Sequence, residues 1–362
     1  MNNSFAGLGV LPVLTEALAA RGIESAFAVQ ELVIPDVLAG RDVLAKSPTG
    51  SGKTLAFGIP LVQRLAAAPH PHAGLVLAPT RELTLQIVDE LEPLAAACGM
   101  RTAAVYGGVG FGPQIARARK AELIVACPGR LEDLIARGDV KLDRVNVLVL
   151  DEADRMLDMG FKHAVEKIVG RTPRKRQTLL FSATLDGAVG KLADSMTRDP
   201  RSHEHRPPQE ERTIVHRFVP VSHEAKLQTL VHELRSDERG RTLVFVRTKR
   251  GADRLVKRLR AHGAEAVAIH GDKSQSQREK ALKRFHSGDT NTLVATDVAA
   301  RGIDVQAITH VINFDAPADR DTYVHRVGRT GRAGSAGVGI TFFKPDEAKE
   351  IKRMRSDLGL AA

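Results

Sequence analysis

Short apolar segments rich in Val, Leu and Ile alternate with helical patterns along the chain, and this alternation restricts the fold more than any other feature. It is typical of βαβ units around a parallel sheet that is buried on both faces. The pattern occurs twice, and 362 residues exceed the usual size of one hydrophobic core. We therefore predict an α/β protein with two tandem parallel-sheet domains. The expected strands are 42–45, 75–78, 103–106, 123–126, 145–150 and 178–181 in the first half, and 242–246, 266–269, 292–295, 310–313 and 339–342 in the second.

A polar segment separates the two halves. Residues 201–212 are rich in charge, contain two consecutive prolines and lack aliphatic side chains, which is typical of a linker. We predict an N-terminal domain at 1–200, a linker at 201–212 and a C-terminal domain at 213–362.

Charge and aromatic content indicate the kind of partner. A formal net charge of +10 favours a polyanion, although many basic proteins bind no specific partner. With no Trp and two Tyr, the chain offers few stacking platforms, so we expect any nucleic acid to be held by its backbone. We found no apolar run of about 20 residues, no basic signal sequence and no metal-ligand spacing of the two cysteines. We therefore expect a cytoplasmic protein without membrane contact.

A phosphate-binding motif is present at 47–54, which reads Ser-Pro-Thr-Gly-Ser-Gly-Lys-Thr between an expected strand and a helical pattern. Backbone N–H groups of such a loop, together with the helix dipole, bind phosphates. Lys53 would reach the β and γ phosphates, and Thr54 would hold Mg²⁺. Ser47 stands where the strict motif has Gly, so an ordinary glycine turn is the alternative. The residues expected to bind the nucleotide here are Thr49, Gly50, Ser51, Gly52, Lys53 and Thr54.

An acidic motif follows the expected strand at 145–150. Asp151, Glu152 and Asp154 emerge at its carboxyl end, where open α/β sheets place their ligands. Asp151 suits a metal ion, and Glu152 suits a general base for the attacking water. The alternative is an acidic helix start that favours the helix dipole.

The ordered set of motifs resembles that of the DEAD-box ATP-dependent RNA helicase family, from Phe5 to the end of the second half. The residues at 151–154 spell the family name. The resemblance implies two RecA-like domains of the P-loop NTPase type, ATP with Mg²⁺ as cofactors, and separation of short RNA duplexes. The other matching pieces are Gln30 after Gly22, 79–83, Gly107 with Gly108, 128–130, 182–184, Gln275 with Arg278, 300–304 and 325–332.

For the adenine base, the resemblance implies that Gln30 reads its edge and Phe5 packs on its face. An amide suits this task because it offers a donor and an acceptor together. The alternative for Gln30 is a solvated helix residue. The Pro-Thr-Pro stretch usual in the family is replaced by Ala-Phe-Ala at 26–28.

In the second half, the resemblance assigns Arg329 and Arg332 to the γ-phosphate and places Gly302 and Asp304 beside the ribose. Arginine fingers contribute roughly 10³ to 10⁵ in rate, whereas a solvated Arg-rich turn is the alternative. Because the phosphate loop lies in the other half, we expect a complete ATPase site only when the two domains close. The resemblance further implies coupling to RNA through Asp154, Ser182, Thr184, His325 and Arg326, with the hydroxyls bonding to Asp154.

The family's RNA contacts fall just after expected strands. Gly and small hydroxyl residues let backbone N–H groups approach phosphate, and Arg adds charge, although each Pro-Gly or Gly-Gly alone is most often a turn. Cys127 stands where the family has Thr, so we predict a weaker contact there and tighter RNA binding by Cys127→Thr. The resemblance implies RNA contacts by Pro79, Thr80, Arg81, Gly108, Pro128, Gly129, Arg130, Gln275, Arg278 and Thr296.

We predict that ATP and one RNA strand bind cooperatively as the domains close, and that hydrolysis reopens them. Two other functions stay open: an ATP-gated RNA clamp that serves as an assembly platform, and a DNA-directed motor. Ribosomal or RNA-decay proteins are expected partners.

Overall fold

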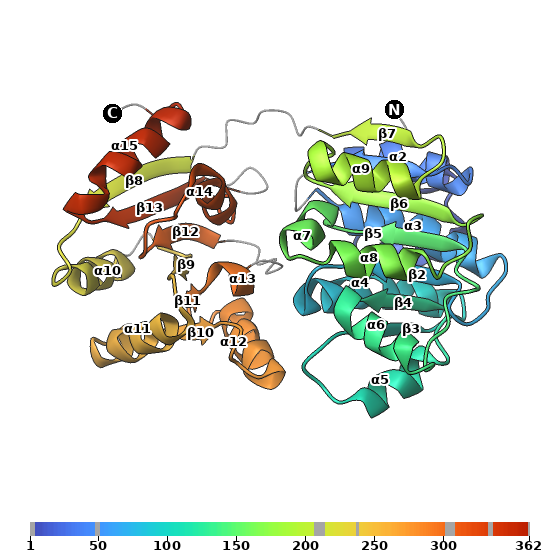
Figure 1. Ribbon diagram of the computed structural model, residues 1–362, viewed down its shortest axis with the longest axis horizontal. Coiled ribbons are helices and arrows are strands. Elements are labelled where there is room, and N and C mark those ends of the chain that lie inside the picture. Colours follow the sequence, from blue (N-terminus) through green and yellow to red (C-terminus); the bar gives the residue numbers. More distant parts are fainter. Residues whose placement is uncertain are drawn as a thin grey trace. The chain divides into compact units, whose positions relative to one another are not determined.

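A computed structural model describes residues 4–47, 51–205, 214–236, 239–300, 308–331 and 336–360, without the side chain of Val298. The chain divides into two compact units, Met1–Pro208 and Gln209–Ala362 (Figure 1). Five residues of the predicted site lie outside the described residues: Thr49, Gly50, Gly302, Asp304 and Arg332.

Unit 1 is built on a seven-stranded sheet in which every strand pair is parallel, in the order β3-β4-β2-β5-β6-β1-β7. The strands are β1 (Val43–Lys46), β2 (Gly74–Leu77), β3 (Thr102–Val105), β4 (Leu123–Ala126), β5 (Val147–Leu150), β6 (Gln177–Ser182) and β7 (Arg201–Glu204). The helices are η1 (Ala6–Leu8), α1 (Pro12–Ala19), α2 (Ala28–Leu38), α3 (Lys53–Ala66), α4 (Arg81–Ala97), α5 (Phe111–Ala118), α6 (Pro128–Ala136), α7 (Ala153–Asp158), α8 (Lys162–Val169) and α9 (Gly187–Met196).

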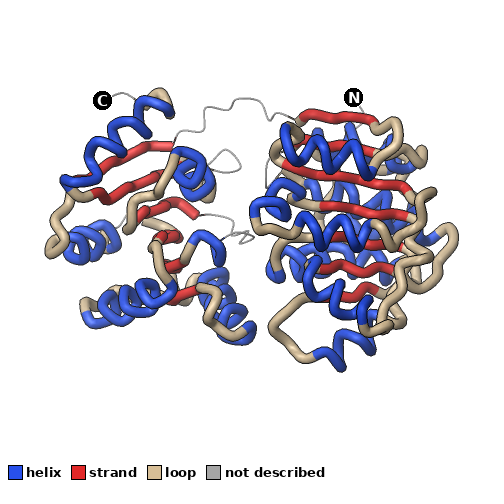
Figure 2. Tube along the Cα trace, in the orientation of Figure 1, coloured by secondary structure: helices blue, strands red, loops and turns tan. Residues whose placement is uncertain are grey.

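Both faces of this sheet are covered by helices (Figures 1 and 2). Successive strand side chains point to opposite faces, so Leu75 and Leu77 join one apolar core while Val76 joins the other. The first core packs against α6, α8 and α9, and the second packs against α2, α3 and α4. Burial on both faces explains why the central strands are continuous apolar runs.

Unit 2 contains a six-stranded parallel sheet in the order β10-β11-β9-β12-β13-β8. Helices α10 and α11 pack against one of its cores, and α12, α14 and α15 against the other. The elements are β8 (Ile214–Pro220), α10 (Lys226–Leu234), β9 (Arg241–Phe245), α11 (Lys249–Ala261), β10 (Val267–Ile269), α12 (Gln275–Ser287), β11 (Thr292–Ala295), α13 (Asp297–Ala300), β12 (Ile308–Asn313), α14 (Arg320–Val327), β13 (Gly337–Phe343), η2 (Pro345–Glu347) and α15 (Ala348–Asp357).

All the predicted strands are present with ends shifted by a residue or two, but the edge strands β7 and β8 were not predicted. The prediction that the linker begins at residue 201 is wrong, because Arg201–Glu204 pairs with β1. This strand is held by ion pairs of His203 with Asp36 and of Glu204 with Lys46, not by apolar side chains. The apolar pattern that reveals the other strands is therefore missing from it.

Candidate functional site

Sheet topology brings three distant segments together in unit 1. Strand β6 lies between β5 and β1, and all three run parallel, so their carboxyl ends share one edge. The phosphate motif leaves β1, the acidic motif leaves β5, and Ser182 ends β6. The Ser47 N–H donates to the carbonyl of Ser182 at 3.0 Å, which joins two of these segments directly.

The described part of the phosphate loop is closed by polar contacts across its base. The Lys53 ammonium donates to the Ser47 carbonyl at 3.1 Å, and the hydroxyls of Ser47 and Ser51 are 2.6 Å apart. Lys53 is buried and is the first residue of α3, with Thr54 beside it. The loop therefore places a cation and a helix N-terminus together, the arrangement that binds phosphates.

Gln30 lies against this loop. Its amide donates to the Gly52 carbonyl at 3.1 Å and accepts from the Phe27 N–H at 2.9 Å, and the side chain is 2% exposed. Each polar atom of the amide has capacity for a second hydrogen bond. Adenine recognition by Gln30 stays a prediction.

Two phenylalanines differ in exposure. Phe5 is 3% exposed within a core cluster, so its ring contributes mainly to packing, and its contact with the base stays a prediction. Phe27 is 61% exposed, and a Cβ added to Gly52 would lie 2.6 Å from its ring. The sequence has Phe27 where the family has Thr, but we did not predict from this replacement that Phe27 contacts the base.

Among the described residues, no lysine or arginine donates a hydrogen bond to the Asp151 carboxylate. It is 3% exposed and accepts the Glu152 N–H at 3.0 Å, and burial raises its pKa to about 6 against the opposing charge of Lys53. Within the described ranges no group of three or more His, Cys, Asp or Glu forms a complete metal cage. Mg²⁺ usually takes one or two protein carboxylates and completes its shell with water and substrate phosphates. Asp151 with the Thr54 hydroxyl fits such a site.

Glu152 has an unusual backbone conformation for a residue with a side chain. Its φ is +53°, in the left-handed region, where strain of about 1 to 3 kcal/mol is common at active sites. Its carboxylate forms an ion pair with Arg155 one turn later. The ion pair fixes the carboxylate at the edge of the sheet beside Asp151.

Ser182 links the acidic motif to β6. The Ser182 hydroxyl accepts the Asp154 backbone N–H at 3.2 Å, while the Asp154 carboxylate accepts the Ala183 N–H at 3.1 Å. The Thr184 side chain is exposed, and its N–H donates to the Ser182 hydroxyl at 3.4 Å. The Ser182 hydroxyl therefore bonds to Asp154 as predicted, through the Asp154 backbone N–H, whereas no bond of the Thr184 hydroxyl to Asp154 is present among the described residues.

The RNA residues predicted in unit 1 gather at the carboxyl ends of β2, β4 and β3, which are neighbouring strands. The Arg81 guanidinium lies over Gly108, because a Cβ at that position would be 2.0 Å from it. Gly108 has φ +86° and is exposed. Arg130 donates to the Val109 carbonyl at 3.0 Å and lies over the Phe111 ring. The remaining members are Pro79 and Pro128, both buried, Thr80, which caps α4, and Gly129.

Cys127 is buried beside a residue of α4. Its sulfur lies 3.3 Å from the Thr84 hydroxyl, the residue is 8% exposed, and burial raises its pKa to about 11. Cys127 also precedes α6 as its N-cap but makes no side-chain cap. Because Cys127 replaces the Thr of the family, the chain lacks at this position a hydroxyl that could cap α6 or contact RNA.

In unit 2, Gln275 begins α12 and donates to Glu279 at 3.0 Å, while its buried Oε1 has no hydrogen-bond partner among the described residues. Arg278 is half-buried on the same helix. Thr296 follows β11 and is 8% exposed.

Arg326 is part of the scaffold of unit 2. Its guanidinium forms two bonds to the Asp297 carboxylate at 2.6 and 2.8 Å and also donates to Asn313 and to the Asp315 carbonyl. The side chain is 4% exposed and packs over Phe245. Its expected role in coupling can therefore act only through the position of α14.

The other two predicted residues of this motif differ in exposure. His325 is exposed on α14, whereas Arg329 follows the helix and is 9% exposed. The Arg329 N–H donates to the Arg326 carbonyl at 3.1 Å, so the anchored arginine fixes the start of the next turn.

Our search for a helix of membrane-spanning length and hydropathy found none in the described part of the chain.

Comparisons with known proteins agree with these motifs. Residues 27–192 match the DEAD/DEAH box helicase family, and residues 225–334 match the helicase conserved C-terminal domain. The chain is 41% identical over 345 residues to the ATP-dependent RNA helicase CshA of Limosilactobacillus reuteri, covering 95% of this chain and 69% of that one. It is 39% identical over 354 residues to the DEAD-box ATP-dependent RNA helicase CshA of Bacillus subtilis, covering 97% and 72%.

Solved structures give the same result. Saccharomyces cerevisiae Dbp5 bound to RNA and ADP BeF3 is similar with a TM-score of 0.86 at 28% identity, over 99% of this chain and 94% of that chain. A DEAD box protein from the hyperthermophile Methanococcus jannaschii has a TM-score of 0.55 at 37% identity, over 99% and 98%. These likenesses confirm the predicted RecA-like fold of both domains. The chain belongs to the DEAD-box ATP-dependent RNA helicase family.

Proposed function

We propose that this protein is an RNA-dependent ATPase that uses ATP to separate short RNA duplexes or to remodel RNA–protein complexes. One observation carries the proposal: the phosphate loop, the acidic motif and Ser182 meet at the carboxyl ends of β1, β5 and β6. The relatives named as ATP-dependent RNA helicases, and Dbp5 bound to RNA and ADP BeF3, support the choice of substrate.

In this proposal, Lys53 binds the β and γ phosphates, and Mg²⁺ held by Thr54 and Asp151 would neutralise charge on them. Glu152 orients the attacking water and accepts its proton. The ion pair with Arg155 keeps the Glu152 carboxylate in place while the water is aligned. The left-handed backbone of Glu152 aims its side chain away from the direction that a regular helix start would give.

Turnover in this proposal also requires Arg329 and Arg332 of unit 2. The rigid pairing of Arg326 with Asp297 supports this role, because it fixes the helix from which Arg329 emerges. Gly302 and Asp304 would contact the ribose. Hydrolysis would then depend on residues of both units.

Gln30 would recognise adenine with the hydrogen-bonding capacity that Phe27 and Gly52 leave free. We propose that Phe27, not Phe5, supplies the aromatic contact to the base. Its exposed ring already touches the phosphate loop at Gly52. Base stacking on such a ring contributes about 1 to 3 kcal/mol.

RNA would be held through its backbone by the Arg81 and Gly108 surface of unit 1 and by Gln275, Arg278 and Thr296 of unit 2. Asp154, Ser182 and Ala183 join the acidic motif to β6, so RNA binding near these strands could alter the position of Glu152. The contacts are sequence-blind, which fits a cytoplasmic enzyme that acts on many RNAs and meets ribosomal or RNA-decay proteins.

The test is ATP hydrolysis with single-stranded RNA, with DNA of the same sequence, and with neither. We expect stimulation by RNA alone, and no hydrolysis by Lys53→Ala under any condition. Equal stimulation by DNA would contradict the proposal and favour a DNA-directed motor. Hydrolysis that is stimulated by RNA without any strand separation would favour an RNA clamp.

A further inference from the structure

A cavity of about 640 Å³ opens on unit 1 at the edge opposite to the phosphate loop. Its lining comes from the segments that precede β1, β5, β6 and β7, together with the end of α3. Because all these strands are parallel, their amino ends share one edge, away from the carboxyl edge that carries Lys53 and Asp151. The cavity is therefore separate from the nucleotide site by topology.

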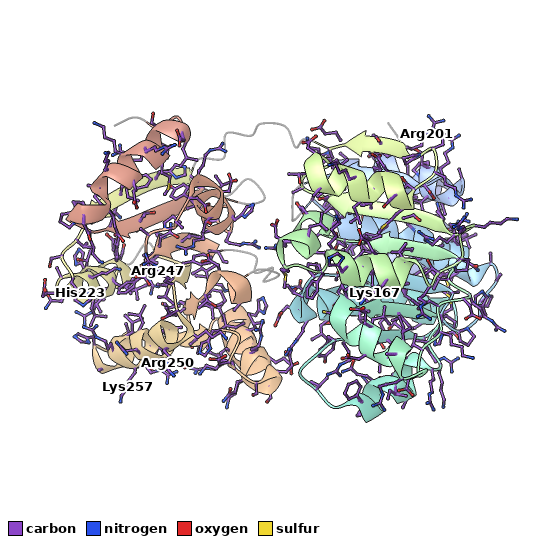
Figure 3. All side chains as sticks on the ribbon, in the orientation of Figure 1. Lys167, Arg201, His223, Arg247, Arg250 and Lys257 are labelled. Atoms are coloured by element: carbon purple, nitrogen blue, oxygen red, sulfur yellow. The ribbon has the colours of Figure 1, made fainter. Side chains whose placement is uncertain are left out.

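Most charged side chains that line this cavity are positive, and we call it the basic cavity. Its lining includes two carboxylates, and that of Asp42 accepts the Thr178 N–H at 2.8 Å and the Arg198 N–H at 2.7 Å. Arg41 is paired with Asp36, but in the described part of the chain no ion pair involves the other cations of the cavity. The cationic lining residues are Arg41, Arg64, Lys175, Arg176, Arg198 and Arg201; Figure 3 labels the last.

Three buried polar atoms of the cavity lack a hydrogen-bond partner among the described residues: Nε of Arg64, Nε of Arg176 and Oε1 of Gln177. The Arg64 and Arg176 guanidiniums otherwise donate only to backbone carbonyls. An unsatisfied buried donor destabilises the fold, more so when it is charged. Only the two arginine nitrogens are donors, because Oε1 of Gln177 accepts hydrogen bonds. Burial also lowers the pKa of Arg176. Uncompensated donors of this kind are expected where an anion binds.

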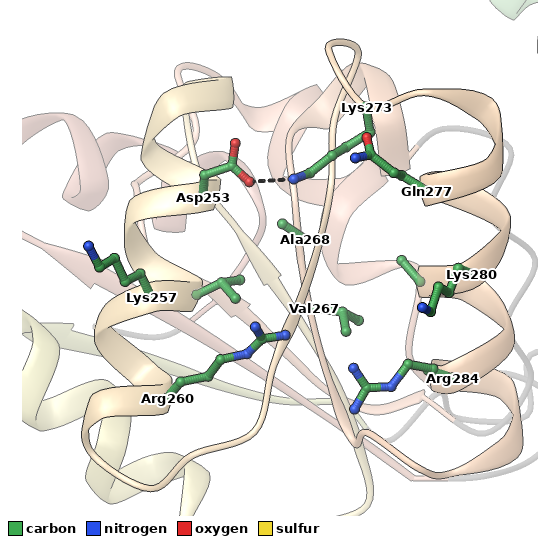
Figure 4. A pocket seen from close by; sticks show the side chains of 11 residues that line it. Asp253, Lys257, Arg260, Val267, Ala268, Lys273, Gln277, Lys280 and Arg284 are labelled. Atoms are coloured by element: carbon green, nitrogen blue, oxygen red, sulfur yellow. Dashed lines mark ion pairs between the residues drawn. The ribbon is translucent and has the colours of Figure 1, made fainter.

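A second cavity, of about 400 Å³, lies between α11 and α12 of unit 2 and can be compared with the basic cavity (Figure 4). Its rim is also cationic, but apolar side chains such as Val267 and Ala268 lie in its lining, and Asp253 pairs with Lys273 at 2.8 Å. None of its lining side chains has a buried polar atom without a partner in the described ranges. The cavity of unit 1 thus differs from this one in having buried guanidinium nitrogens without a hydrogen-bond partner, among the described residues, in its lining.

We propose that the basic cavity binds a phosphate-bearing polyanion. Several guanidiniums in one cavity match phosphate oxygens by charge and by paired N–H donors, and the volume is that of an ordinary ligand site. The phosphates could belong to an RNA strand that continues beyond the predicted RNA surface or to a small polyphosphorylated molecule. An anion there would pair with lysine and arginine side chains that form no ion pair within the described part of the chain.

The first test uses inorganic tripolyphosphate as the probe and calorimetry of the full chain saturated with ADP, so that the phosphate loop is filled. We expect binding by the unchanged protein and at least a tenfold loss in the double variant Lys175→Gln/Arg198→Gln. The control is Lys120→Gln/Arg144→Gln, which removes the same charge from exposed positions of unit 1 outside the cavity. Unchanged ADP affinity shows that both variants are folded.

The second test measures the affinity of single-stranded RNA against salt concentration for the same proteins. If RNA fills the cavity, the cavity variant binds RNA more weakly than the control does. Its slope of log RNA affinity against log salt concentration also falls in magnitude by about 1.4, the value for two phosphate contacts. If a small polyphosphate is the ligand, RNA binding by the cavity variant equals that of the control and only tripolyphosphate binding falls. Two results would overturn the proposal. In the first, the cavity variant and the control bind tripolyphosphate equally and bind RNA equally. In the second, the unchanged protein does not bind tripolyphosphate, and the cavity variant and the control bind RNA equally.

Discussion

The carboxyl edges of the two sheets hold their carboxylates in different ways. In unit 1, backbone N–H groups hold Asp151 and Asp154, and no described lysine or arginine forms an ion pair with either. In unit 2, Arg326 pairs with Asp297 through two bonds. The same type of side chain at the same type of edge thus has no ion-pair partner among the described residues in one unit and is paired with an arginine in the other.

The carboxylates of unit 1 that backbone N–H groups hold suit a binding site, whereas the paired carboxylates of unit 2 suit a structural role. Asp315 of unit 2 follows the second pattern, because it pairs with Lys226 at 2.7 Å and accepts the Arg247 N–H. Asp151 and Asp154, held by backbone N–H groups, remain available to a metal ion, whereas Asp297, paired with an arginine of α14, holds that helix in place. Glu152 of unit 1 is the exception, because it pairs with Arg155 of the next helix turn. We infer that unit 1 is prepared for Mg²⁺ and phosphate, while unit 2 is built to fix α14.

The largest expected effect concerns Glu152 at the unit 1 edge. Glu152→Gln keeps the size of the side chain but removes the base, so ATP hydrolysis should fall by at least about 100-fold. ATP affinity should persist, and RNA should be released slowly in the presence of ATP. Single-turnover hydrolysis and RNA dissociation rates measure both. Rapid release of RNA with ATP would contradict the scheme.

The scaffold role of Arg326 predicts a loss of stability. Arg326→Met removes the buried guanidinium that pairs with Asp297, which is one-third exposed, and that donates to Asn313 and to the Asp315 carbonyl. The free energy of unfolding of unit 2 should fall by about 1 to 3 kcal/mol. The double variant Asp297→Asn/Arg326→Met should recover part of this loss, as measured by denaturant unfolding. Arg320→Met, at an exposed position of α14, should change stability by less than about 0.5 kcal/mol. Equal stability of the Arg326 and Arg320 variants would refute the scaffold role.

A smaller effect is expected for the aromatic contact in unit 1. Phe27→Thr removes the exposed ring and should weaken ATP binding about fivefold or more, the lower end of a stacking contribution. Phe5→Leu should leave ATP affinity unchanged and lower stability by up to about 1.5 kcal/mol, because Phe5 is in the core. Titration with a fluorescent ATP analogue distinguishes the two. The reverse order of affinities would restore the assignment of Phe5 to the base.

The smallest effect is expected at Cys127. Thr at this N-cap can accept an N–H of α6, so Cys127→Thr should raise the stability of unit 1 by about 0.5 to 1 kcal/mol. A modest gain in RNA affinity is also predicted. Thermal unfolding and RNA titration check both, with Cys98→Thr as the control. A variant that is less stable and binds RNA no better would show that the Thr84 contact requires the thiol.

The sequence predicted those parts of the fold that depend on apolar periodicity, and it did not predict parts that depend on polar pairing. Central strands such as β5 are continuous apolar runs, whereas β7 is held by His203 and Glu204 ion pairs that no local pattern reveals. Motif spacing likewise predicted that the phosphate loop and the acidic motif share an edge.

Motif spacing could not assign neighbouring arginines to different tasks. Arg326 and Arg329 are three residues apart with the same side chain, yet the partner of Arg326 is Asp297, which is distant in sequence. The same applies to Phe5 and Phe27. Each directly precedes a helix, η1 or α2, yet one is buried in the core and the other is exposed.

The central claim is that ATP hydrolysis requires Lys53 of unit 1 and Arg329 of unit 2 on the same triphosphate. RNA-stimulated hydrolysis and ATP affinity of Arg329→Ala, measured side by side, test it most directly. The account predicts an affinity close to that of the unchanged protein and a turnover lower by about 10³-fold or more. Hydrolysis at the unchanged rate would contradict it.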